Sequence, residues 1–236
     1  MTESVIYGKR KIPVTLIERN RKTLAITVKP DRKVEVYMPE GANRERVMRH
    51  VSKKAKWMAK HLDYFEKNRK FTNKKEYVSG ESHSFMGRQY RLRVRKSIYE
   101  SVKISGGFIY LYVKDVKDYK HKKEVLYQWY KWQAEKRFAS VLLSRVKRLA
   151  RYKIKLPEFY IKTMKTRWGS CSPNKGRINL NIELIKTPRQ CVEYIIDHEL
   201  LHFIVRNHDK KYYDLLTKAT PDWKTRKEKL EKYLIV

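Results

Sequence analysis

Residues 197–213 read DHELLHFIVRNHDKKYY, which places three histidines and a glutamate at spacings that suit metal chemistry. On a helix, His198 and His202 lie four residues apart and project from the same face, one turn apart. Two imidazoles so placed can bind one tetrahedral zinc ion. Glu199 points to an adjacent side, where its carboxylate can act as a general base without binding the metal. The stretch therefore fits the HExxH pattern of zinc hydrolases.

His208 is the predicted third ligand. It lies six residues after His202, so the helix must end between them for the third imidazole to turn back toward the same ion. We expect Asn207, which tolerates the left-handed conformation, to help provide this exit, and Asp209 to cap a second helix through residue 219. Three neutral histidines leave zinc a fourth position for water, as in a catalytic site.

A second interpretation is a helix whose histidines only pack against tyrosines. By composition alone, an HExxH match is expected on the order of once in a hundred such chains. We therefore favour the metal site.

The elements before the site follow from local patterns. Thr187, Pro188 and Gln190 fit a helix N-cap, first helical position and capping box. Residues 177–182 alternate between apolar and polar, which predicts a strand along which an extended substrate could pair.

The preceding chain combines short strands with helical stretches, and no internal repeat is evident in it. The patterns predict a hairpin over 24–38, a helix over 43–69, strands near 90–94, 102–104 and 109–113, and a helix over about 120–150.

The chain is strongly basic, with 57 Lys and Arg against 25 Asp and Glu and a net charge of +32. Residues 1–150 carry 38 basic and 15 acidic side chains. Such a field attracts polyanions, so we expect any DNA to bind the N-terminal half, although a solvated basic surface is the alternative. Trp129, Tyr130 and Trp132 could stack on bases, but packing in a core is the favoured use.

Other features indicate a soluble cytoplasmic protein. The N-terminal residues lack an apolar signal region, and no run approaches the ~20 apolar residues that span a bilayer. Cys171 and Cys191 are too few for a disulfide framework. Cys171 has no neighbouring histidine in the sequence that would make it a nucleophile.

The segment from Arg167 to Trp223, with the landmarks RWGSC, GRINLNI and HELLHFIVRNH, resembles the YgjP-like metallopeptidase family, also called DUF45. Residues 77–94 resemble the N-terminal region of that family, which is related to SprT-type zinc proteases that act on DNA-associated proteins. The resemblance implies one zinc ion per chain on His198, His202 and His208, with Glu199 as catalytic base. It also implies that residues 167–171 and 179–181 support the cleft.

Two positions depart from related patterns. Val205 stands where metzincins have a glycine, so a metzincin assignment is not supported. Tyr212 and Tyr213 replace the Phe-Trp pair usual in the family, and one of their hydroxyls could reach an oxyanion.

The predicted fold class is α+β. We expect a basic, strand-rich N-terminal region with one helix over 1–118, then a small zincin-like metallopeptidase domain over 119–236. The predicted function is zinc-dependent hydrolysis of polypeptides, and the relatives of the family suggest polypeptides associated with nucleic acid as substrates. The alternatives are a DNA-binding or scaffold protein with a structural zinc, and an enzyme that hydrolyses a small amide.

Overall fold

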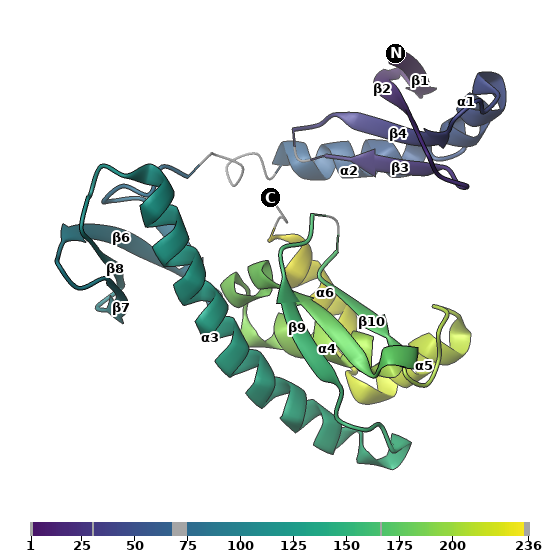
Figure 1. Cartoon of the computed structure of the whole chain (residues 1–236). Helices are drawn as coiled ribbons and strands as arrows, with labels where there is room; N and C mark the ends of the chain where they lie inside the picture. Colours follow the sequence, from purple (N-terminus) through teal and green to yellow (C-terminus); the bar gives the residue numbers. More distant parts are fainter. Residues whose placement is uncertain (1, 30, 68–74, 166, 234–236) are drawn as a thin grey trace. The chain divides into compact units, whose positions relative to one another are not determined.

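A computed structural model describes residues 2–29, 31–67, 75–165 and 167–233 (Figure 1). The chain divides between residues 74 and 75 into two compact units. Each unit has its own cluster of buried apolar side chains. The mixture of sheets and helices confirms the predicted α+β class.

The division differs from the predicted boundary at 118/119, which lies inside the second unit. Residues 75–118 belong there because their strands share one core with the helix that follows. Leu92 and Leu111 of these strands are fully buried in the same cluster as Phe138. Residues 114–117 lead directly into this helix, whose N-cap is Asp118.

The first unit is a four-stranded sheet with two helices. Its elements are β1 (Thr2–Tyr7), β2 (Arg10–Arg19), β3 (Ala25–Val28), β4 (Val34–Pro39), α1 (Arg44–Ser52) and α2 (Ala55–Lys67). The strand order is β1-β2-β4-β3, with β2 and β4 parallel. β3 and β4 form the predicted hairpin. The single helix predicted over 43–69 is two helices, because α1 ends at the C-cap Lys53.

The second unit opens with another four-stranded sheet and a long helix. Its elements are β5 (Ser82–Phe85), β6 (Arg88–Lys96), β7 (Ser101–Ser105), β8 (Phe108–Val113) and α3 (Tyr119–Arg148). The strand order is β5-β6-β8-β7, with β6 and β8 parallel. The four-stranded sheets of the two units therefore share one topology, a structural repeat that the sequence did not reveal.

The rest of the second unit surrounds a three-stranded sheet. Its elements are η2 (Ala150–Tyr152), β9 (Glu158–Lys162), β10 (Gly169–Ser172), η3 (Pro173–Lys175), β11 (Arg177–Asn181), η4 (Ile182–Lys186), α4 (Arg189–Leu201), α5 (Lys210–Ala219) and α6 (Trp223–Glu231), where η marks a 3₁₀ helix. The order is β10-β11-β9, so β11 is central and β10 lies at an edge. Among the described helices, none has the length and apolar character needed to cross a membrane.

Contacts near both ends of α4 fix this helix within the unit. The buried Arg145 on α3 forms an ion pair with both carboxylate oxygens of Asp197 on α4, with Nε 2.7 Å from Oδ1. The hydroxyl of Thr220, just after α5, also donates to Asp197. At the other end of α4, Gly87 has a φ of +80° and lies so close to Pro188 that an added Cβ would be 2.8 Å from the proline ring.

We predict that Arg145→Leu lowers the free energy of unfolding of the second unit by about 3–5 kcal/mol, because Asp197 would remain buried without its partner. The exposed Lys147 on the same helix offers a matched control, and Lys147→Leu should change stability by less than about 0.5 kcal/mol. Urea unfolding followed by tryptophan fluorescence measures both variants. Equal small losses would show that the ion pair does not hold α3 against α4.

Candidate metal centre

The helix that carries HExxH begins and ends differently from the prediction. Thr187 does not cap it. Its hydroxyl donates to the carbonyl of Leu184, 2.8 Å away, and α4 starts after Pro188. The helix ends at Leu201 with His202 as its C-cap, and Asn207 does not adopt a positive φ. The predicted cap of α5 is confirmed, since Asp209 Oδ1 accepts from the backbone N–H of Tyr212 at 2.9 Å.

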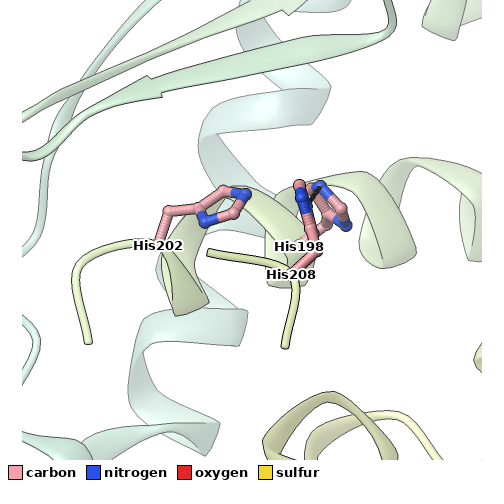
Figure 2. A group of neighbouring side chains, drawn as sticks. All are labelled: His198, His202 and His208. Atoms are coloured by element: carbon pink, nitrogen blue, oxygen red, sulfur yellow. Dashed lines mark hydrogen bonds between the residues drawn. The ribbon is translucent and has the colours of Figure 1, made fainter. Parts of the chain in front are cut away.

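The structure brings the three predicted histidines together on one side of α4 (Figure 2). One donor nitrogen from each of His198, His202 and His208 lies within 4.8 Å of the others. In the described part of the chain, no other group of three or more His, Cys, Asp or Glu side chains meets this test. His198 and His202 are half-buried and His208 is exposed, so the cluster opens to solvent on one side.

The hydrogen bonds of the rings leave nitrogen lone pairs for an ion. His202 Nδ1 lies 3.1 Å from the carbonyl oxygen of Val205, which can only accept, so Nδ1 carries the proton and Nε2 is free to bind a metal. The Nε2 atoms of His198 and His208 lie 3.0 Å apart. Without a cation one of these atoms must be protonated to donate to the other, whereas a cation lets both lone pairs bind it.

The protonation of the cluster also suits a metal. Burial is the main cause that lowers the pKa of His198 to about 3, and the neighbouring His202 and His208 contribute to the same shift. Burial and His202 lower the pKa of His208 as well. Neutral imidazole is the form that binds a metal, so the residues present fit a divalent cation with nitrogen preference, such as zinc.

Glu199 lies beside the histidines and is only 4% exposed. Burial raises the pKa of its carboxyl to about 8, and the positive charge of Arg167 opposes this rise. A divalent cation on the histidines would add to the positive charge of Arg167 and lower the pKa of Glu199. This favours the carboxylate that a general base requires.

Gly169 makes room for this carboxylate, a role that the sequence analysis missed. A Cβ at position 169 would lie 2.5 Å from Oε1 of Glu199 and 2.9 Å from its Cγ. Any larger residue would have to displace the glutamate side chain. The first residue of β10 thus sets where Glu199 lies.

Tyr212 supports the histidines from α5. It is fully buried, its ring stacks on His202 with centroids 4.9 Å apart, and its hydroxyl donates to the carbonyl of His198 at 3.1 Å. Because this hydroxyl is already engaged, it does not serve the oxyanion role considered for it. Tyr213 is 40% exposed and stacks on Trp223 instead.

The site lies in a cleft of about 700 Å³ between β10 and the end of α4. Arg167, Cys171, Asn174 and Arg206 line this cleft, together with the histidines and Glu199. The strand that borders it is β10, an edge strand with one side free of strand partners in the described sheet. The sequence prediction of strand 177–182 as the pairing edge was wrong, because β11 is paired on both sides by β9 and β10.

Residues of β11 hold the segment that leads into β10. The buried side chain of Asn181 donates to the carbonyls of Met164 and Arg167 at 2.8 and 2.9 Å, and Asn179 donates to the hydroxyl of Ser170 at 3.1 Å. These bonds support the interpretation of both landmark segments as structural. Cys171 is half-buried, and burial raises its pKa to about 12, which disfavours the thiolate that nucleophilic attack needs.

Comparisons with known proteins identify the family of the chain. A solved structure, the metallopeptidase zymogen jannalysin of Methanocaldococcus jannaschii, is similar at 21% identity over 39% of this chain and 92% of its own, with a TM-score of 0.35. A search of curated proteins gave no match. The model of the YgjP-like metallopeptidase domain matches residues 22–233, nearly the whole chain. The chain therefore belongs to the YgjP-like metallopeptidase family.

Proposed function

We propose that the chain is a zinc-dependent peptidase in which His198, His202 and His208 hold the ion and Glu199 is the general base. Family membership implies a metal and peptide substrates. The observation that carries the finer proposal is the convergence of three imidazoles within 4.8 Å, next to the buried carboxylate of Glu199 and the edge strand β10. A metal with a purely structural role needs no such carboxylate.

In this proposal, zinc supplies a Lewis acid that polarises the scissile carbonyl and acidifies a water molecule. Glu199 takes the proton from the attacking water and passes it to the nitrogen of the leaving amine. Gly169 keeps the carboxylate in place for both transfers. Tyr212 holds the ring of His202 and the backbone of His198, so that the ligands need little rearrangement.

The free edge of β10 is the proposed place for the substrate backbone. An extended peptide can add to an edge strand through main-chain hydrogen bonds. Because Gly169 of β10 closely approaches the side chain of Glu199, a peptide paired along β10 would pass near this carboxylate. Such pairing favours a polypeptide over a small amide, because a small amide would leave most of the edge unused. The choice between them is tested by comparing peptides of increasing length.

We also propose that the substrates are proteins associated with nucleic acid. The support for this is the net charge of +32, which would bring the chain to polyanions. The rival function, a DNA-binding scaffold with structural zinc, shares this charge but predicts no hydrolysis.

We predict that untagged protein contains about one zinc ion per chain, and that His208→Ala lowers this content severalfold at equal free zinc. His50 on α1 is an exposed histidine outside the cluster, so His50→Ala is the matched control and should keep full zinc. Mass spectrometry of metal content checks the set. Equal zinc in wild type and His208→Ala would remove His208 from the ligands.

We predict that Glu199→Gln keeps its zinc but loses peptide hydrolysis by about 100- to 10,000-fold, because the amide cannot accept the proton of water. Glu193 lies on the same helix outside the cleft, and Glu193→Gln should stay within about twofold of wild type. Cleavage of a fluorogenic peptide library checks both. Wild-type turnover in Glu199→Gln would contradict the assignment of the base.

We predict that Gly169→Ala retains zinc and reduces kcat on the order of 100-fold, since the added Cβ must displace the carboxylate of Glu199. Lys162→Ala changes an exposed residue of β9, at the other edge of the same sheet and outside the cleft, and serves as the control. Metal content and kcat are measured on the same preparations. Unchanged kcat in Gly169→Ala would show that the position of Glu199 does not depend on this contact.

A further inference from the structure

The sheet β5–β8 has two chemically different faces. Leu92, Ile109 and Leu111 point to one face and are fully buried in the core with α3. Because side chains alternate along strands, the intervening residues project from the other face. We call it the outer face and define it by Arg91, Arg93 and Arg95 of β6, Lys103 of β7, and Phe108, Tyr110 and Tyr112 of β8.

The outer face is positively charged without compensation. Strands β5 to β8 contain no Asp or Glu. The three arginines and Lys103 are exposed, and within the described residues none of the four makes an ion pair or a side-chain hydrogen bond with another residue. Their N–H groups are therefore available to an anionic partner.

Aromatic rings form a row along β8, between the cations. The ring centroids of Phe108 and Tyr110 lie 6.0 Å apart, and those of Tyr110 and Tyr112 lie 6.4 Å apart with planes inclined by only 19°. The register places each ring next to an arginine of β6, with Phe108 opposite Arg91, Tyr110 opposite Arg93 and Tyr112 opposite Arg95. The guanidinium of Arg93 also lies 4.7 Å from the centroid of Phe108.

The first unit provides an internal comparison, because its sheet has the same strand order. At corresponding positions of its inner parallel pair, Thr15 lies opposite Glu35 and Ile17 opposite Tyr37. Glu35 accepts hydrogen bonds from Lys29 and Tyr37. The same topology thus forms without a row of arginines and rings, so the fold does not require the composition of the outer face.

We infer that the outer face binds single-stranded nucleic acid, with bases stacked on the rings of β8 and phosphates bound by the arginines of β6 and Lys103. Base stacking on aromatic side chains of a four-stranded sheet is a general mode of single-strand recognition. Ring spacings of 6.0 and 6.4 Å are nearly twice the ~3.4 Å rise per base of a duplex strand, so they suit bases that are spread apart. In a duplex, neighbouring base pairs cover the faces of the bases, so the rings of β8 could not stack on them.

The aromatic residues of α3 considered in the sequence analysis are less suited to this role. Tyr130 is buried, and Trp129 packs against Phe85 with centroids 5.0 Å apart. Trp132 is 55% exposed but stands with a single cation, Lys136, over its ring. This pair has the same chemistry away from the outer face and is a matched control.

The test is fluorescence anisotropy of the full chain with fluorescein-labelled dT15 across a series of salt concentrations. Tyr110→Ala/Tyr112→Ala should weaken binding at least about tenfold with little change in salt dependence, because stacking is lost and the charges remain. Arg91→Gln/Arg93→Gln/Arg95→Gln should weaken binding and reduce the slope of log K against log salt by about 2, for three lost phosphate contacts. The control Trp132→Ala/Lys136→Gln should bind within about twofold of wild type.

The arginine variant changes only exposed side chains, so it keeps the test decisive should the tyrosine variant unfold. Wild-type affinity in the arginine variant, or an equal loss in the control, would overturn the inference in favour of general basic attraction. Equal binding of a 15-base-pair duplex, unaffected by the tyrosine substitutions, would overturn it too. The measurement does not depend on peptidase activity, so it remains informative whatever the fate of the proposed function.

Discussion

The buried ion pair between Arg145 and Asp197 is the contact on which the site most depends. It joins the long helix α3 to α4 at the residue immediately before His198, and the hydroxyl of Thr220 ties the end of α5 to the same carboxylate. Two charges removed from water are tolerated only when they are fully paired. The geometry that satisfies Asp197 therefore also fixes the position of the first histidine.

From that fixed point the cleft is assembled by close contacts between distant parts of the sequence. Tyr212 packs beneath the imidazoles, and Gly169 lets β10 approach the carboxylate of Glu199. Asn181 holds the segment before β10 through two backbone carbonyls. Each of these contacts positions a backbone segment or a ring and adds no reactive group. The proposed chemistry is therefore confined to the three histidines and Glu199, and the surrounding residues fix where these side chains lie.

The three histidines and Glu199 could be predicted from the sequence because they lie close together in one short stretch of it. A spacing of four residues on a helix fixes which side chains share a face, and the α+β class follows from alternating and helical periods that can be read in short windows. The prediction failed where long-range pairing decides. Nothing local shows that β11 is central and β10 is the edge, or that residues 75–118 share the core of α3.

The shared strand order of the two four-stranded sheets was missed for the same reason, because it depends on pairing between strands that are distant in the sequence. The two four-stranded sheets have one strand order and each buries an apolar face, but they carry different side chains on their outward faces. The freedom of the other face is what allows the second sheet to present arginines and rings. Basic charge was evident in the composition, but its concentration around a row of rings required the strand register.

The most direct test of zinc binding by the three histidines is X-ray absorption at the zinc edge on the zinc-loaded protein. We expect one zinc ion with three imidazole nitrogens and one oxygen, all at about 2.0–2.1 Å. A sulfur ligand at about 2.3 Å, which would implicate Cys171 or Cys191, or fewer than three imidazoles would contradict it.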